Sequence, residues 1–478
     1  MSWSNPTTWA WVFVLSEWTI RLWMLAVVPF RRTPAAAKGW LLLIFVEPWV
    51  GLALYLLIGR ARMPRWRVEQ MARLPAKMAG VIGRLRAHPQ AHPPGLGANL
   101  SLASDLASKL GRLPVLGHNA TEILVDYDAI LGQLVADIDR AERHVHLMYY
   151  LFVVDAATVP VIEALERAVG RGVTCRVLVD ALGSRSALPA LMPRLSSAGV
   201  QASEMLPVGL LRRRTARPDL RNHRKIAVID GRIAYTGSQN LVASDFRAGV
   251  TYEELVLRVT GPAVLALQLI FAADWFLETD KVLDDDDVFP EPRLAGSIPI
   301  QALPSGPDFP TQNNQRLIVA LIHAARRQVQ IATPYFIPDE PLLQALQTAV
   351  LRGVEVHLVV SEKKEQVLVS LAQKSYYEEL LEAGVQVHLY RQNFLHAKFI
   401  TFDESISIVG TSNMDIRSFV LNAEHVLVVY DAAMTDRLRS EMQRYRSQCR
   451  TLTLEEWRGR PFRHALAEHM ARMFSPLL

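Results

Sequence analysis

The stretch that decides the fold is Arg221-Asn-His-Arg-Lys-Ile-Ala-Val-Ile-Asp-Gly-Arg-Ile-Ala-Tyr-Thr-Gly-Ser-Gln-Asn240, because its polar residues recur at the same internal spacing in the second half of the chain. The recurring pairs are His223 and His396, Lys225 and Lys398, Asp230 and Asp403, Gly237 and Gly410, Ser238 and Thr411, and Asn240 and Asn413. Each copy has a polar start, a β-rich run, an Asp turn, a second β-rich run and a small-residue exit. Residues two apart on a strand share a face, so the His and Lys of each copy can bind the same anion.

The repeat extends beyond this motif. Residues 163–180 parallel residues 344–361, and both stretches read as a helix, an Arg-Gly turn and a buried strand. From about Val115 onward strands and helices alternate, which predicts an α/β sandwich. The chain therefore contains two copies of one fold, divided near the acidic run Asp284–Asp287 and Pro290.

These residues carry a resemblance to a known family. The doubled motif resembles the HxKxxxxD signature of the phospholipase D superfamily, and residues 333–338, 410–422 and 474–478 resemble bacterial cardiolipin synthases that carry an N-terminal membrane hairpin. The resemblance implies an α/β fold of two phospholipase D-type sandwich repeats related by a pseudo-twofold axis, preceded by a two-helix membrane hairpin. The expected domains are the hairpin at 1–60, a basic amphipathic linker at 61–115 lying along the membrane, and repeats at 116–290 and 291–478.

Composition favours membrane association, because half of the residues are hydrophobic and 21% are charged. The net charge of +5 suits an anionic membrane or nucleic acid and alone decides neither. Two cysteines are too few for a disulfide framework.

Two apolar segments, about 8–30 and 39–59, open the chain. Each approaches the ~20 residues that cross a bilayer as a helix. Length and apolar content favour spanning or deep insertion, and a helix lying in the membrane interface is the alternative. Two antiparallel helices would bring Arg21 and Glu47 to similar depth, so we expect these two charges to pair. The competing pair is Arg21 with Glu17, four residues apart on one helix.

Basic residues follow both apolar segments. Arg31, Arg32 and Lys38 lie between the segments, and a larger group, Arg60, Arg62, Arg65 and Arg67, follows the second. The positive-inside rule thus pulls both ends of the second segment toward the cytoplasm, and the larger group favours a cytoplasmic catalytic part. The resemblance implies the inner membrane of a bacterial cell, and the two apolar segments predict a multi-pass anchor. A further run, Arg212–Arg214 with Arg217, reads equally well as a solvated loop or as a lipid-headgroup contact.

Neither motif alone makes an active site, but pairing them brings two His and two Lys around one phosphate. One imidazole can attack phosphorus, the other can protonate the leaving alkoxide, and the ammonium groups can hold the non-bridging oxygens. This chemistry needs no metal or other cofactor. Asn240 and Asn413 could donate to the same oxygens. Asp230 and Asp403 complete the motif but lie on the opposite strand parity, which favours a structural role.

Family resemblance adds the supporting acids and the roles. It implies that each His is oriented by a Glu of the other repeat, which pairs His223 with Glu424 and His396 with Glu254 rather than with Glu253. It also makes His223 the nucleophile and His396 the general acid and then base. Three tyrosines near strand ends, Tyr149, Tyr150 and Tyr335, read as packing residues at the entrance.

The sequence thus predicts a membrane-bound cardiolipin synthase that joins two phosphatidylglycerol molecules through a phosphatidyl-histidine intermediate. Rival interpretations are a phospholipase D-type hydrolase, a synthase that takes its phosphatidyl group from phosphatidylethanolamine, a nuclease, and an inactive binding module. Apolar segments and modest basicity argue against nucleic acid, and two complete motifs argue against an inactive fold. The expected partner is an anionic membrane, with a homodimer left open.

The C-terminal segment, residues 455–478, has apolar residues at helical intervals and is expected to dock on the catalytic body or on the membrane.

Overall fold

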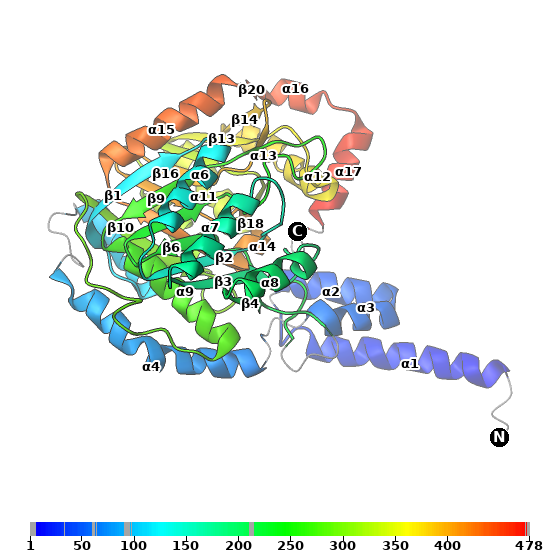
Figure 1. Cartoon of the computed structure of the whole chain (residues 1–478). Coiled ribbons are helices and arrows are strands. Elements are labelled where there is room, and N and C mark those ends of the chain that lie inside the picture. The colour runs from blue at the N-terminus through cyan, green and yellow to red at the C-terminus, as the bar shows by residue number, and fades with distance from the viewer. Residues whose placement is uncertain are drawn as a thin grey trace. The chain divides into compact units, whose positions relative to one another are not determined.

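The structure is a computed structural model of the chain, and it describes residues 6–32, 34–59, 63, 65–89, 96, 98–209, 215–473 and 475 (Figure 1). The described residues form two compact units. The N-terminal unit falls within residues 1–68 and 208–219, and the catalytic unit falls within residues 69–207 and 220–478. The predictions made for Arg60, Arg62, Arg212–Arg214, Phe474 and residues 476–478 lie outside the described residues.

The N-terminal unit contains α1 (Pro6–Val27), α2 (Pro34–Val46), α3 (Pro48–Leu54) and the short π-helix η1 (Tyr55–Gly59). Within α1, residues 9–27 are long and apolar enough to cross a membrane. The second apolar segment is not the continuous helix that was expected. Glu47 adopts non-helical dihedral angles, and Pro48 begins a new helix because its ring cannot continue the previous one. Helix α3 packs back on α2, where a Cβ at Gly51 would lie 2.7 Å from the Cα of Ile44.

This break also explains why the predicted pairing of Arg21 with Glu47 is wrong. Arg21 Nη1 lies 3.2 Å from Glu17 Oε2, and Arg21 Nε donates to the carbonyl oxygen of Phe45 at 3.2 Å. Glu47 is exposed at the junction of α2 and α3. The helix that would have brought Glu47 to the depth of Arg21 ends at Val46, so the competing pair on one turn of α1 forms instead.

The catalytic unit is built on one large mixed sheet, which has sixteen strands in the described part of the chain. In sheet order, the first half contains β1 (Leu116–Leu124), β9 (Val256–Thr260), β7 (Ile233–Gly237), β6 (Ile226–Ile229), β2 (His144–Tyr149), β3 (Thr174–Asp180) and β4 (Gln201–Met205). The second half contains β10 (Ile298–Ser305), β19 (Asn422–Val429), β17 (Ile406–Gly410), β16 (Phe399–Phe402), β11 (Gln328–Ala332), β13 (Glu355–Ser361), β14 (Gln386–Tyr390) and β20 (Cys449–Thr451). The halves meet where β1 pairs antiparallel with β10, so the strand order repeats about a pseudo-twofold axis.

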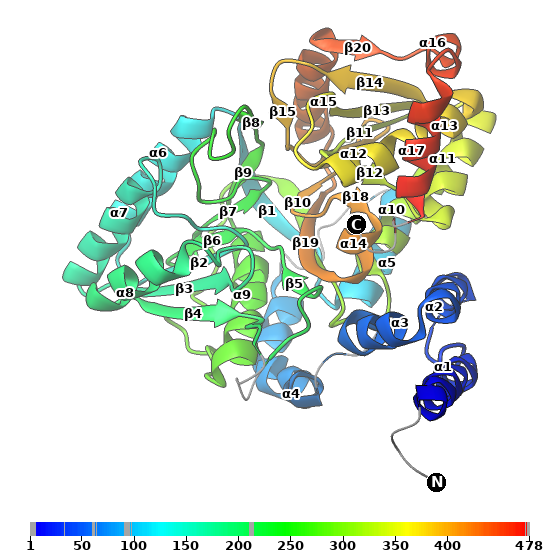
Figure 2. The same ribbon diagram turned by 90° about the vertical axis from the view of Figure 1, so that its right-hand side faces the viewer.

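Helices cover this sheet, and their apolar faces form its hydrophobic cores (Figure 2). The first half contributes α6 (Tyr127–Asp139), α7 (Val159–Gly170), α8 (Leu188–Ser197) and the almost wholly buried α9 (Ala263–Thr279). The second half contributes α10 (Asn313–Ala324), α11 (Glu340–Leu351), α12 (Val367–Lys374), α13 (Tyr377–Ala383), α14 (Ile416–Val420), α15 (Ala432–Ser447), α16 (Leu454–Arg458) and α17 (Phe462–Arg472).

The expected linker forms two helices, α4 (Arg65–Ala87) and α5 (Ala98–Gly111). Met78, Val81 and Leu85 of α4 are buried in the same core as α9, and α5 packs on α10 and β10. The expectation that the apolar face of this segment lies along the membrane is therefore wrong, because protein covers it. Arg84 also pairs with Asp286 of the acidic run at 2.7 Å.

Candidate active site

The register of two short strands brings the two motifs together. Strand β5 (Arg221–Asn222) pairs in parallel with the start of β19, where Asn222 lies opposite Ala423. Strand β15 (Phe394–Leu395) pairs in the same way with β8 (Tyr252–Glu253), where Leu395 lies opposite Glu253. One residue further along each register, a histidine of one repeat faces a glutamate of the other. The fold thus builds the site from both repeats.

Both cross-repeat hydrogen bonds are present in the structure. Nδ1 of His223 lies 2.8 Å from Oε1 of Glu424, and Nδ1 of His396 lies 2.7 Å from Oε1 of Glu254. Because a carboxylate can only accept, each Nδ1 carries the proton and each Nε2 is the nitrogen that can react with a substrate. Glu253 instead forms an ion pair with Arg444 at 2.9 Å.

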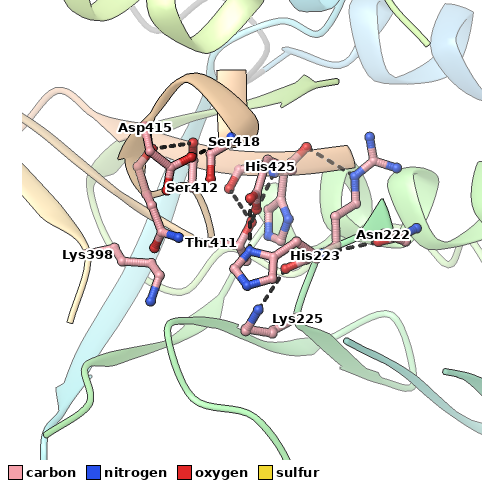
Figure 3. A network of polar contacts seen from close by, with 12 residues as sticks. Asn222, His223, Lys225, Lys398, Thr411, Ser412, Asp415, Ser418 and His425 are labelled. Atoms are coloured by element: carbon pink, nitrogen blue, oxygen red, sulfur yellow. Dashed lines mark hydrogen bonds and ion pairs between the residues drawn. The ribbon is translucent and has the colours of Figure 1, made fainter. Parts of the chain in front are cut away.

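The two lysines lie beside the histidines. Lys225 Nζ donates to the carbonyl oxygen of His223 at 2.7 Å, and Lys398 Nζ donates to that of His396 at 2.7 Å. Figure 3 shows Lys225 and Lys398 approaching His223 from different ribbons. The Tyr150 ring packs edge-on against His223, with 5.0 Å between centroids. Each motif histidine therefore has an ammonium group held beside it.

Burial dominates the electrostatics of these four groups. It lowers the pKa of His223 to about 4 and also lowers the pKa of His396. It lowers the pKa of Lys225 to about 7 and that of Lys398 to about 8, and the two ammonium groups repel each other. Both imidazoles are therefore neutral near pH 7, as an attacking nitrogen must be.

Burial opposes ionisation of the two glutamates, but their partners outweigh it. The pKa values of Glu254 and Glu424 lie below the ordinary value because each carboxylate faces a histidine and a lysine. Each acid also has a hydroxyl beside it. Glu424 Oε2 accepts from Thr411 Oγ1 at 2.6 Å, and a hydrogen bond from the Ser238 side chain likewise helps to lower the pKa of Glu254.

The glycines that end β7 and β17 are required for steric reasons. A Cβ at Gly237 would lie 2.3 Å from the carbonyl oxygen of Leu255, and one at Gly410 would lie 2.4 Å from that of His425. Only glycine allows β7 and β17 to approach the backbone next to the two glutamates.

The histidines open into a cleft of about 340 Å³. Asn240 and Asn413 line it, and so do Tyr150 and Tyr335. The predicted donation from these asparagines to phosphate oxygens stays a prediction. Asn240 Oδ1 accepts from the backbone of Leu151 at 3.3 Å, which directs its amide NH₂ elsewhere. Asn413 Oδ1 is buried without a hydrogen-bond partner among the described residues. Tyr149, in contrast, is buried in the core.

The motif aspartates lie at the other end of their strands from the histidines. Asp230 accepts from the backbone of Glu142, Arg143 and His144, at 2.8 to 2.9 Å. Asp403 accepts in the same way from residues 326–328. Both adopt positive φ, 54° and 47°, at the turn. These bonds tie each hairpin to the strand beside it, which is a structural role.

Sequence reasoning missed a buried polar network that holds β5. Asp274 of α9 lies 2.6 Å from Arg224 Nη1 and accepts from Asn222 Nδ2 at 2.9 Å. Asp180 accepts from the backbone of Asn222 at 2.9 Å and pairs with Arg221. An isolated aspartate in an otherwise apolar helix was the signal that could have found Asp274, because an unpaired charge is rarely buried.

Sequence reasoning also missed a link across the cleft. Arg247 of the first repeat pairs with Glu365 of the second at 2.9 Å, and the Tyr335 hydroxyl donates to the same carboxylate. Among the described residues, no three His, Cys, Asp or Glu side chains are grouped as metal ligands.

Two neutral imidazoles in one cleft, each held by a carboxylate and with a lysine beside it, are an arrangement that can support phosphodiester transfer. The family model described as cardiolipin synthase, phospholipase D-like domain, matches residues 134–275 and 318–446. The chain belongs to this family.

Full-length relatives agree with this assignment. Cardiolipin synthase A of Pectobacterium carotovorum subsp. carotovorum is 33% identical over 98% of both chains, and that of Erwinia tasmaniensis is 34% identical over 99% of both. Among solved structures, phosphatidylserine synthase from Haemophilus influenzae Rd KW20 matches 79% of this chain and 100% of its own, with a TM-score of 0.61 and 15% identity. That likeness supports the fold alone.

Proposed function

We propose that the chain is a cardiolipin synthase, which transfers a phosphatidyl group from one phosphatidylglycerol to another and releases glycerol. The observation that carries this proposal is the pair of histidines in one cleft, each oriented by a glutamate of the other repeat. Likeness to full-length cardiolipin synthases supports the choice of phospholipid substrates.

In the first step, Nε2 of His223 attacks the phosphorus of one phosphatidylglycerol. The N–P bond forms, the bond from phosphorus to the glycerol oxygen breaks, and protonated His396 gives its proton to that oxygen. In the second step, a glycerol hydroxyl of another phosphatidylglycerol attacks the phosphatidyl-histidine. His396 takes the hydroxyl proton while the new P–O bond forms and the N–P bond breaks. Lys225 and Lys398 stabilise the negative charge in both transition states.

We assign the nucleophile to His223, as the family resemblance implies. Glu424 orients this histidine with one oxygen and accepts from Thr411 with the other. Burial also lowers the pKa of His223 to about 4, which keeps this imidazole neutral. His396 must instead carry a proton when substrate is bound, and the anionic phosphate favours that protonation.

The chain is membrane-associated, and we propose α1 as the helix that spans the bacterial inner membrane. Helix α2 has 13 residues and therefore a length of only about 20 Å, and α3 packs back on it, so we propose that this pair is inserted in the membrane without crossing it. The predicted multi-pass anchor stays a prediction. The basic residues that follow these helices favour a catalytic unit on the cytoplasmic side.

One experiment tests the proposed reaction. The full-length protein in detergent is incubated with phosphatidylglycerol alone, and the products are identified by mass spectrometry. We expect cardiolipin and glycerol in equal amounts, and neither product from the His223→Asn variant. Phosphatidic acid without cardiolipin would identify a hydrolase instead. Cardiolipin that forms only after phosphatidylethanolamine is added, with release of ethanolamine, would identify a different donor.

A further inference from the structure

Helix α17 docks on the catalytic unit through its polar side. Arg460, just before the helix, pairs with Glu378 at 2.9 Å and with the buried Glu468 at 3.0 Å. Arg472 pairs with Glu379 at 3.1 Å. Figure 2 shows α17 beside α12 and α13, and α12 packs directly on it. The expected docking of the C-terminal segment on the catalytic body is thus present through residue 473.

The opposite face of this helix is apolar and exposed. Phe462, Leu466, Met470 and Met473 follow one another at helical spacing and are 80, 50, 52 and 63% exposed. A helix on the surface of a protein normally turns its apolar stripe toward the core and its charges toward water. In helix α17 the large apolar side chains face outward, with exposed Arg463 and His469 beside them, while the inner side carries Ala471 and the paired Glu468.

This exposed face continues to the mouth of the active-site cleft. Val367 and Leu368 of α12 are exposed between Gln366 and Val369, which both line the cleft. Phe246, another cleft residue, and Val420 of α14 are also exposed. These residues with the α17 stripe form the apolar rim, defined as Phe246, Val367, Leu368, Val420, Phe462, Leu466, Met470 and Met473. In the described part of the catalytic unit, the large hydrophobic side chains exposed elsewhere are Leu102, Leu294 and Leu351.

The charges near the rim favour an anionic surface. Lys363, Lys364 and Arg463 are exposed beside Val367 and Phe462 in the sequence. The neighbouring carboxylates are engaged: Glu365 pairs with Arg247, and Glu362 pairs with Arg391 and Arg450. Apolar side chains flanked by lysine and arginine suit the boundary between anionic headgroups and acyl chains.

We propose that the apolar rim is a membrane-contacting surface, which enters the headgroup–acyl boundary of an anionic bilayer and holds the cleft mouth at headgroup level. This inference rests on the proposed function. A cleft of about 340 Å³ has the size of a small-ligand site. It therefore accommodates the reacting headgroups while the acyl chains of both substrates stay outside. The rim gives those chains an apolar path from the bilayer to the cleft.

Spin labels test this contact in the full-length protein. In a background with Cys175→Ala and Cys449→Ser, a nitroxide is placed at Leu466→Cys or, as control, at Leu351→Cys, which is outside the rim and 86% exposed. In phosphatidylglycerol vesicles we expect oxygen dissolved in the lipid to relax the label at 466 and a water-soluble nickel chelate to relax the label at 351. Equal nickel access at both positions would overturn the proposal. So would a label at 466 that is shielded from both reagents already in detergent, because a protein would then cover the rim.

Kinetics give a second readout. The triple variant Phe462→Ser, Leu466→Ser, Met470→Ser should lose about tenfold of its turnover on phosphatidylglycerol vesicles, while turnover of a short-chain, monomeric phosphatidylglycerol stays unchanged. The matched control is Leu102→Ser, Leu294→Ser, Leu351→Ser, which should behave as wild type on both substrates. Unchanged turnover of the rim variant on vesicles would contradict the proposal. Failure of the wild type to make cardiolipin would count against the proposed function itself.

Discussion

At the scale of single residues, the two lysines proposed for catalysis lower the stability of the folded protein, because their charged groups are buried. Each ammonium group is buried beside another, and hydrogen bonds to histidine carbonyl oxygens hold them there. Burial lowers the pKa of Lys225 from 10.5 to about 7, so folding must disfavour its charged form. A bound phosphodiester supplies the negative charge that makes this arrangement favourable.

Lys225→Met should therefore abolish activity and stabilise the protein. We expect kcat to fall by about 10²–10³ or more, because a charge that stabilises the transition state is removed. Between pH 7 and 10.5 the unfolded chain binds more protons than the native protein at this position. The destabilisation caused by burying Lys225 is therefore complete below pH 7 and vanishes above pH 10.5. Thermal unfolding at several pH values measures this cost. The gain in melting temperature should be largest near neutral pH and shrink as pH rises.

A matched variant, Lys364→Met, changes an exposed lysine and should alter neither stability nor turnover on short-chain substrate. If Lys225→Met proved less stable than wild type at pH 7, the hydrogen bond to His223 would outweigh the cost of burying the charge.

At the scale of elements, the position of β5 depends on a partner in a distant helix. Asp274 of α9 binds both Arg224 and Asn222, which flank the catalytic His223. Asp274→Ala should leave Arg224 charged and buried without this partner, at a cost of about 3–5 kcal/mol. Urea unfolding measures the loss. An exposed control, Asp286→Ala, removes a surface pair and should cost less than about 1 kcal/mol. Equal effects of the two variants would contradict the assigned role of Asp274.

The secondary-structure elements differed in how well the sequence predicted them. The strands around both motifs were predictable, because the repeat fixes their spacing and the turns carry Asp and Gly. The identity of the medium that covers an apolar face was not predictable. Periodicity of Leu74, Met78 and Val81 suits a membrane as well as a protein core, and the core covers them. In α17 the same kind of pattern faces outward. The Glu47-Pro48 break was visible in the sequence, but segment length alone suggested one helix.

At the scale of the whole molecule, the cross-repeat design explains why one chain carries two motifs. Each parallel β-bridge delivers a histidine of one half to a glutamate of the other, so neither half holds a complete site. The pairing of His223 with Glu424 and of His396 with Glu254 followed from the family resemblance, and the structure contains both bonds. The bond of Thr411 to Glu424 was not predicted, because a small hydroxyl residue after a strand is also an ordinary turn residue.

Chelation tests whether protein side chains, rather than a metal ion, supply the positive charge at the site. Turnover should survive exhaustive treatment with EDTA, because Lys225 and Lys398 supply the positive charge around the phosphate. Turnover of short-chain phosphatidylglycerol in detergent is the appropriate readout, since divalent cations also alter anionic membranes. Complete loss of turnover that returns only when a metal is added would contradict this account.

The most direct test of the central claim separates the roles of the two histidines. The substrate is phosphatidyl-p-nitrophenol, whose leaving group departs without a proton. His396→Asn should release about one nitrophenol per active site in a rapid burst and then stop, because His223 still forms the phosphatidyl-histidine but no base activates the acceptor. His223→Asn should show no burst. A burst from His223→Asn and none from His396→Asn would reverse the roles, and steady turnover in both variants would contradict a histidine-linked intermediate.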